Sequence, residues 1–443
     1  MYDLDRQLSE FASFVDDAVA PIQVGEAMER PKRSYTRSRR VGISIVFATF
    51  VAMAIGLVVL IAPLGTEDGN VADRMPPATT EGLEVAPTPD ANSLTWTRVD
   101  DADLGGDGVQ MIHSLRSTSI GLIAVGEDDH RPAIWISAEG TDWSRIDVSP
   151  SESPYGDESV LWINDVADNG SRLVAVGIDQ RGSSESWSVE GTGSVAFWYS
   201  DDGYTWTRAP HNGEAFEVEG GWSREMIRIV ATPGGFVAVG DSIWISVDGI
   251  TWTRRESPGD WQSDLAVTAD GMILVGAGQS IAWTSADGVN WIESEIQPPV
   301  GPDGGGLTAI TPFSGGFLAS GGDDSALAWF SVDGQSWELR GGVDGFDNFA
   351  YNSQSDIAAL TDHVLIVGMR YPMFGTGVAT IWQSEDGGYT WNVFDDPEHI
   401  MGIAYSEVYH SSAFAVAAFE GRFLVAGYRA DDASVWIGTL EDS

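Results

Sequence analysis

One short pattern returns along most of the chain, and it limits the fold more than any other feature. Its clearest copy, SDDGYTW, occupies residues 200–206. Further copies lie at 246–252, 285–291 and 331–337, a longer one at 384–391, and an altered one at 137–143. Each copy follows a short apolar and aromatic run, which predicts a strand that leads into a turn. A repeat of this kind predicts an array of similar structural units.

The chemistry of the pattern is that of a tight turn. Asp248 can accept hydrogen bonds from backbone N–H groups of the turn, and Gly249 can adopt a positive φ at little cost. Trp252 can then bury its ring between neighbouring sheets. We interpret the acidic residue and the tryptophan of every copy as structural. These residues are Glu139, Asp202, Asp248, Asp287, Asp333 and Asp386, with Trp143, Trp206, Trp252, Trp291, Trp337 and Trp391.

The pattern resembles the Asp-box, or BNR repeat, of sialidase-like β-propellers. The same repeat occurs in Hcf136-type photosystem II assembly factors, in sortilin-like receptors and in several glycoside hydrolases. The resemblance therefore implies a β-propeller and leaves the activity open, because enzymes and non-enzymes share the repeat. In style the chain is closer to the non-enzymatic Hcf136-type and sortilin-like propellers than to true sialidases.

A second repeat gives an independent count of the blades. Seven apolar runs end in glycine, at 122–126, 173–177, 236–240, 272–276, 317–321, 364–368 and 423–427. The last run is followed by a strand-like segment, 434–438, without a turn motif after it. Residues 94–98 match the strand that follows the turn elsewhere. We therefore expect residues 94–98 to complete the last blade of an all-β, seven-bladed propeller that spans 93–443.

Three segments precede the predicted propeller. Residues 1–40 carry apolar residues at helical spacing, which predicts a short amphipathic helix, either peripheral or docking a cytoplasmic partner. Residues 41–64 hold no charge and are long enough for a single transmembrane helix. A cleaved signal peptide is disfavoured because the apolar run starts late and lacks a small-residue cleavage site. Residues 65–92, which contain four prolines, are expected to form a disordered linker.

Charge predicts the orientation and excludes one class of partner. Basic residues gather just before residue 41, so the N-terminus is expected in the cytoplasm and the propeller outside the cell membrane. Acidic residues outnumber basic ones 66 to 23, for a net charge of −43. Such a field repels nucleic acid. Because the chain has no cysteine, disulfide and thiol chemistry are excluded as well.

Ligand binding is expected on the face opposite the Asp-box turns. Those turns join the third and fourth strands of a blade, so the links between blades lie on the other face. Aromatic, arginine and histidine residues predicted in or next to its loops are the candidate ligand-binding residues: Trp187, Trp222, Arg224, Tyr351, Arg370, Tyr371, His410 and Arg429. No residue receives a catalytic role, and the six histidines show no metal-ligand spacing.

One acidic loop is a candidate calcium site. Asp101, Asp103 and Asp107 alternate with other residues beside two glycines, as in calcium loops, but the bidentate Glu of an EF-hand is missing. An ordinary solvated loop is the competing interpretation. None of the patterns requires a cofactor.

The leading hypothesis is a membrane-tethered binding or scaffolding module for a protein, peptide or glycan outside the cell. One alternative is a surface-anchored, sialidase-like glycoside hydrolase. Where sialidases carry the Arg-Ile-Pro type motif of their first substrate-binding arginine, this chain has only Arg98, Val99 and Asp100, without the proline. A second alternative is the ectodomain of a sensor that signals through a cytoplasmic partner. The sequence does not predict the oligomeric state.

Overall fold

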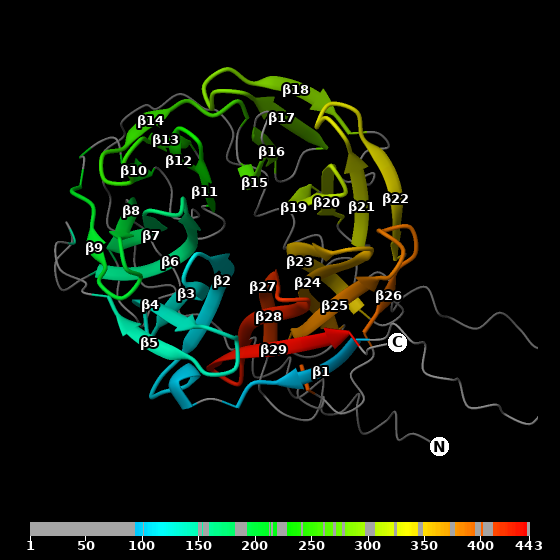
Figure 1. Cartoon of the computed structure of the whole chain (residues 1–443), viewed down its shortest axis with the longest axis horizontal. Coiled ribbons are helices and arrows are strands. Elements are labelled where there is room, and N and C mark those ends of the chain that lie inside the picture. Colours follow the sequence, from blue (N-terminus) through cyan, green and yellow to red (C-terminus); the bar gives the residue numbers. More distant parts are fainter. Residues whose placement is uncertain are drawn as a thin grey trace, which may run out of the picture. The chain divides into compact units, whose positions relative to one another are not determined.

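The propeller is seen in a computed structural model of the chain (Figure 1). It describes residues 94–440 apart from these gaps: 101, 149–152, 154–158, 182–192, 212, 214–215, 219–227, 241, 260–261, 269–271, 277–279, 297–305, 323–325, 344–348, 373–376, 395–399 and 402–410. All described residues belong to one of two structural units, Val85–Ser443. Within that unit the strands form seven antiparallel sheets arranged around a ring (Figure 1).

The first four sheets follow one another along the chain. Sheet 1 contains β2 (Gln110–Thr118), β3 (Gly121–Asp128), β4 (Arg131–Ser137) and β5 (Ser144–Asp147). Sheet 2 contains β6 (Ser159–Asp168), β7 (Leu173–Arg181), β8 (Gly193–Ser200), β9 (Thr207–Arg208) and β10 (Glu217–Val218). Sheet 3 contains β11 (Arg228–Thr232), β12 (Gly235–Val239), β13 (Ile243–Ser246) and β14 (Thr253–Arg255). Sheet 4 contains β15 (Gln262–Val267), β16 (Met272–Gly276), β17 (Ile281–Ser285) and β18 (Ile292–Glu295).

The remaining sheets complete the ring. Sheet 5 contains β19 (Leu307–Phe313), β20 (Gly316–Gly321), β21 (Ala326–Ser331) and β22 (Glu338–Val343). Sheet 6 contains β23 (Phe349–Leu360), β24 (His363–Pro372), β25 (Val378–Ser384) and β26 (Asn392–Val393). Sheet 7 contains β27 (Ser411–Phe419), β28 (Arg422–Arg429), β29 (Asp432–Leu440) and, as its outer strand, β1 (Leu94–Arg98).

Strand β1 closes the ring, as residues 94–98 were expected to do. It pairs antiparallel with β29, and Trp96 lies opposite Gly438. The two strands come from opposite ends of the propeller sequence, so their pairing holds the first and last parts of the domain together. It also gives β29 a partner on its outer side, where an open array would leave an exposed edge.

The structure corrects the predicted fold class in two respects. Six sheets consist of consecutive strands and one is composite, but sheet 2 has a fifth strand, β10, which the prediction did not include. The prediction also included helices, but the part of the chain that the structure describes contains only one 3-10 turn, η1 (Ala102–Leu104). No helix there is long and apolar enough to span a membrane. The segments 1–40, 41–64 and 65–92 lie outside the described residues.

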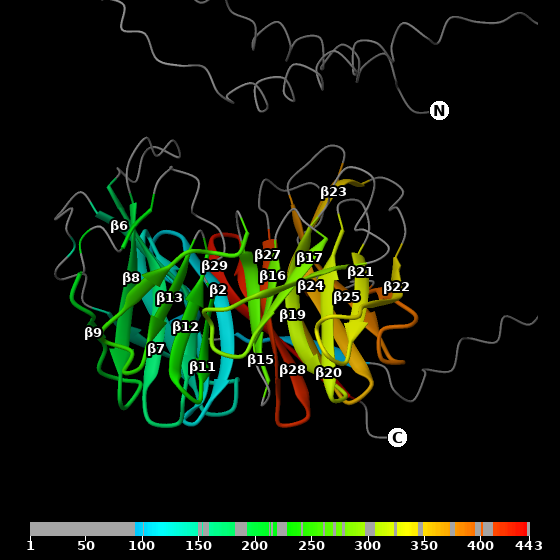
Figure 2. The same ribbon diagram turned by 90° about the horizontal axis from the view of Figure 1, so that it is seen from above.

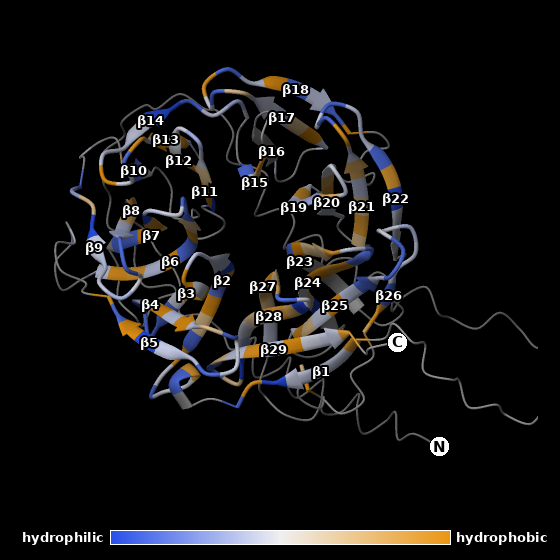
Figure 3. Ribbon diagram, viewed as in Figure 1, coloured by the Kyte–Doolittle hydropathy of each residue, from blue (hydrophilic) through white to orange (hydrophobic). Residues whose placement is uncertain are grey.

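The core consists of seven hydrophobic clusters, one between each pair of neighbouring sheets. Between sheets 2 and 3, for example, the ring of Phe197 stacks on Trp252 with 3.8 Å between centroids. Each sheet contributes one buried tryptophan from its third strand: Trp135, Trp198, Trp244, Trp283, Trp329, Trp382 and Trp436. In Figure 3 hydrophobic segments recur on the strands of every sheet. Figure 2 shows these strands running through the thickness of the ring.

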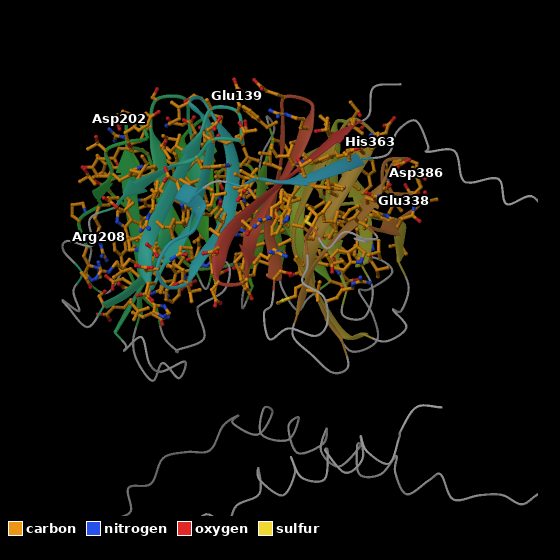
Figure 4. The ribbon with its side chains drawn as sticks, turned by 90° about the horizontal axis from the view of Figure 1, so that it is seen from below. Glu139, Asp202, Arg208, Glu338, His363 and Asp386 are labelled. Atoms are coloured by element: carbon orange, nitrogen blue, oxygen red, sulfur yellow. The ribbon has the colours of Figure 1, made fainter. Side chains whose placement is uncertain are left out.

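Five of the Asp-box turns share one arrangement of hydrogen bonds to the carboxylate. In sheet 2, Asp202 Oδ1 accepts the N–H groups of Tyr204 (2.8 Å) and Thr205 (2.7 Å). Ser200 Oγ accepts the Gly203 N–H, and Trp206 Nε1 donates to the Gly203 carbonyl. The same carboxylate bonds recur at Asp248, Asp287, Asp333 and Asp386. Figure 4 shows Glu139, Asp202 and Asp386 along one edge of the propeller, with Arg208 nearer the other.

These turns make the propeller sensitive to acid. Backbone N–H groups of Ser336 and Gln335 bind the Asp333 carboxylate and lower its pKa below 3.8. A depressed folded-state pKa contributes stability above the unfolded pKa, and that stability is lost as the pH falls through the folded value. We therefore expect the urea concentration at the midpoint of unfolding to decrease when the pH is lowered below about 4. The Asp333→Asn variant, which keeps an acceptor without titrating there, is expected to show a shallower fall. Identical pH slopes would contradict this role.

Candidate functional site

The first strands of the sheets lie nearest the axis of the propeller (Figure 1). In six of them a β-bulge interrupts the pairing with the second strand; β11 is the exception. The residue that follows the bulge has the same register in each sheet, and Arg228 of β11 holds the same position. We call these seven positions the axial ring: Ser114, Asp165, Arg228, Asp264, Ala309, Asp356 and Ala415.

The three aspartates of the axial ring join neighbouring sheets. Each carboxylate accepts a backbone N–H from the first strand of the next sheet. The pairs are Asp165 with Ile229 (3.1 Å), Asp264 with Ile310 (2.7 Å) and Asp356 with Val416 (3.1 Å). Sheets 2 and 3, 4 and 5, and 6 and 7 are linked in this way. A bond from Ser114 Oγ to Asp165 (2.5 Å) links sheets 1 and 2.

Two arginines neutralise most of this buried negative charge. Arg116 lies between two aspartates, with Nε 3.1 Å from Asp165 Oδ1 and Nη1 3.4 Å from Asp356 Oδ2. Burial opposes its charge, but Asp165, Asp356 and Asp264 outweigh burial and raise the pKa of Arg116. Arg228 Nε lies 3.9 Å from Asp264 Oδ1. With every group ionised, two arginines and three aspartates leave one negative charge.

We call the two arginines and three aspartates joined by these ion pairs the axial network: Arg116, Arg228, Asp165, Asp264 and Asp356. Asp264 is its least compensated member. Burial raises its pKa to about 6, the charge of Arg228 opposes that rise, and the charge of Asp356 adds to it. Its ion pair is also the longest of the three. A raised folded-state pKa favours the folded state below the unfolded pKa near 3.8, and this contribution is lost as the pH rises through about 6. The ionised form of Asp264 therefore lowers stability at neutral pH.

The carboxylates and arginines of the axial network are engaged in contacts between sheets. A sialidase-like enzyme needs arginines that are free to bind the carboxylate of the substrate. Both arginines of the axial network pair with aspartates instead. Glycoside hydrolysis needs two carboxylates that a sugar can reach. The side chains of Asp165, Asp264 and Asp356 are 1%, 8% and 7% exposed, and their oxygens already accept backbone N–H groups.

A second polar cluster lies where sheet 1 meets sheets 2 and 7. We call it the seam cluster and define it by His113, Glu127, His130, Phe414 and Tyr428. His113 is the bulged residue of β2, and its Nδ1 lies 3.0 Å from the carbonyl oxygen of Ile163 in sheet 2. Its Nε2 lies 3.9 Å from Glu127 Oε1, and Glu127 Oε2 lies 3.3 Å from His130 Nδ1.

Two aromatic residues of sheet 7 complete the seam cluster. The ring of Phe414 meets His113 edge to face at 6.0 Å between centroids, and Tyr428 lies 5.7 Å from Phe414. Burial lowers the pKa of His113 below 6.5, against the opposing effects of Glu127 and of the bond to Ile163. The side chains of His113, Glu127 and His130 are 19%, 14% and 29% exposed, so solvent reaches the cluster.

The structure describes four of the eight residues predicted to bind a ligand. Arg370 lies on β24, where its Nε donates to Thr380 Oγ1 (3.2 Å), and Arg429 holds the corresponding position on β28. Tyr351 and Tyr371 are direct partners in the register of β23 and β24. Thus two arginines and two tyrosines come from adjacent sheets 6 and 7. The other four predicted residues, Trp187, Trp222, Arg224 and His410, lie outside the described residues.

The acidic loop predicted to bind calcium is described only in part. Asp103 belongs to η1, and its carbonyl accepts a hydrogen bond from Trp135 Nε1 (2.9 Å). The carbonyl of Asp107 accepts one from Gln110 Nε2 (3.3 Å). Asp101 lies outside the described residues. Among the residues that are described, no group of three acidic or histidine side chains could hold a metal ion.

Sequence reasoning missed the axial ring and the seam cluster. One signal for the ring was available: every ring residue stands twelve positions before the glycine that closes the apolar run, as 177 − 165 = 12 and 276 − 264 = 12 show. Three aspartates and an arginine at that position do not fit an apolar inner strand. No comparable signal marks His113, because the seam cluster combines three sheets.

Comparison with known proteins bears on the fold. No protein-family model matches the sequence, and no curated protein matches it. Among solved structures, YCF48 bound to a D1 peptide is 15% identical over 80% of this chain and 99% of its own, with a TM-score of 0.51. The GH74 xyloglucanase of Xanthomonas campestris is 16% identical over 79% of this chain, with a TM-score of 0.52. This chain spans about half of that enzyme, 54%.

A sialidase of Trypanosoma rangeli is also similar, at 13% identity and a TM-score of 0.40, over 79% of this chain and 59% of its own. The match to YCF48, with a TM-score above 0.5, confirms the predicted β-propeller fold. At these identities the likeness extends to the fold alone.

Proposed function

We propose that the propeller is a non-catalytic module that binds a positively charged segment of a protein or peptide partner. The observation that carries the proposal is the state of the axial carboxylates. They are buried, paired with arginines and bonded to backbone N–H groups of the next sheet. An enzyme that used this axis would need at least one of them free for substrate.

Charge supports a cationic partner. The chain after residue 64 carries 16 arginines and 59 acidic residues, and 16 − 59 = −43. A field of this size speeds association with positively charged segments and repels anionic ligands such as sialic acid.

The similar structures agree with either binding or hydrolysis. YCF48, which was solved bound to a D1 peptide, matches over almost its whole length. The xyloglucanase matches over about half of its length. A glycoside hydrolase remains the second candidate, but the ion pairs and hydrogen bonds of the three axial carboxylates do not favour it. The membrane anchor at 41–64 and the location outside the cell stay predictions.

A peptide-binding screen with the full-length chain tests the proposal. We expect peptides with several lysines or arginines to bind at 0.05 M salt and to lose most of their affinity at 1 M salt, where the Debye length is about 3 Å. Neutral and acidic peptides of the same length serve as controls. In parallel, xyloglucan and sialyllactose are incubated with the chain. Release of sugar, or equal affinities for cationic, neutral and acidic peptides, would overturn the proposal.

A further inference from the structure

The seam cluster lies beside the two shortest connections on its face. β3 and β4 are joined through Asp129 and His130, with φ of 48° and 63°, and β28 and β29 through Ala430 and Asp431, with φ of 55° and 74°. Positive φ at both central residues is typical of two-residue hairpin turns. Gln110 N–H donates to the Asp431 carbonyl (2.7 Å), which fixes the second turn against β2. Such short turns leave the ends of β3 and β28 uncovered by their own hairpins.

The hydrogen-bond geometry places two acceptors side by side. Nδ1 of His113 faces a carbonyl oxygen, which only accepts, so Nδ1 carries the proton and Nε2 presents its lone pair. Glu127 Oε1, also an acceptor, lies 3.9 Å from Nε2, which is too far for a hydrogen bond between the two atoms. A carboxylate oxygen can accept more than one hydrogen bond, so Glu127 can serve a ligand while it binds His130.

The spacing of these acceptors suits one ammonium nitrogen. A nitrogen about 2.8 Å from each acceptor would make two charge-assisted hydrogen bonds at roughly a right angle. The ring of Phe414 packs edge to face on His113, and Tyr428 packs on Phe414, which gives the acceptors an aromatic wall. Arg228 also acts on His113, but its own charge is paired with Asp264.

We propose that His113 and Glu127 form a subsite for a lysine ammonium group of the bound partner. This inference rests on the proposed peptide-binding function, since it names the side chain that the partner places in the seam cluster. Glu127 supplies the negative charge, neutral His113 supplies the second acceptor, and His130 holds Glu127 in place.

Small probes test the subsite separately from any partner. Nα-acetyl-lysine amide and its uncharged analogue Nα-acetyl-norleucine amide are titrated into the full-length chain, and the ring signals of His113 and His130 are followed by NMR. We expect the lysine probe to shift both signals with a millimolar dissociation constant and the norleucine probe to leave them unchanged. Glu127→Gln is expected to weaken the lysine probe about tenfold. His113→Phe, which keeps the ring contact with Phe414, is expected to weaken it several-fold.

A matched control removes the same charge elsewhere. Glu338→Gln changes an exposed glutamate on β22, and it is expected to leave the affinity of the lysine probe unchanged. Equal binding of both probes, or equal affinities of Glu127→Gln and Glu338→Gln, would overturn the subsite. The peptide screen separates the two proposals. If cationic peptides bind and Glu127→Gln has no effect, the subsite fails alone; if no peptide binds, the proposed function fails.

Discussion

Replacing Arg116 by methionine is expected to lower the free energy of unfolding by about 3–5 kcal/mol. The side chain of Arg116 pairs with Asp165 and Asp356, which are 1% and 7% exposed. Methionine keeps much of the aliphatic volume but leaves both carboxylates with an uncompensated charge. Each aspartate still binds a backbone N–H of the next sheet, so the charge cannot move into solvent without opening that contact. Urea denaturation of the full-length chain at pH 7 measures the loss.

Two further variants decide whether the loss comes from buried charge. Arg255→Met makes the same change at an exposed position of β14 and is expected to cost less than about 0.5 kcal/mol. The double variant Arg116→Met with Asp356→Asn removes one of the two uncompensated buried charges, so it is expected to recover part of the stability. If Arg116→Met costs no more than Arg255→Met, the axial network does not hold the blades together.

The ring closure could be predicted because its signals are local. Residues 94–98 carry the Trp-Thr-Arg sequence that follows the Asp-box in other copies, and β1 indeed pairs with β29. The register adds a reason that the sequence did not show. A side chain at Gly438 would meet the ring of Trp96, with the nearest ring carbon 2.8 Å from its Cβ. Glycine at this position therefore leaves room for Trp96 to pack under β29.

The pairings within the axial network could not be predicted because the partners are distant in sequence. Arg116 and Asp356 are 240 positions apart, and only the closed ring brings them together. The bulges hide the pattern as well, since each adds a residue to the first strand and shifts the alternation of inward and outward side chains. Simple alternation of side chains along the strand therefore does not predict which way the side chain of Asp165 points. A similar limit applies to His113, which is itself a bulged residue.

A glycine closes each of the seven apolar runs, and replacing one of them is expected to destabilise the propeller. The variant Gly177→Ala is expected to lower the free energy of unfolding severely. Gly177 of β7 lies opposite Ile163, immediately before the bulge of β6. A Cβ at Gly177 would overlap the carbonyl oxygen of Trp162 and lie 2.9 Å from the Cα of Ile163. Since both are backbone atoms, no side-chain rotation can relieve the overlap. The bulge itself would have to move, and with it Asp165, which binds Arg116 and Ile229.

We expect Gly177→Ala to cost about 3 kcal/mol or more, at the upper end for overpacking, because the overlap falls on backbone in two strands. Gly234→Ala is the matched control. The nearest atom to a Cβ there is Thr232 Oγ1 at 3.8 Å, an ordinary contact, so little change is expected. Urea denaturation of both variants gives the comparison. If the two substitutions cost the same, the bulge does not require glycine opposite it, and the seven glycine-closed runs would need another explanation.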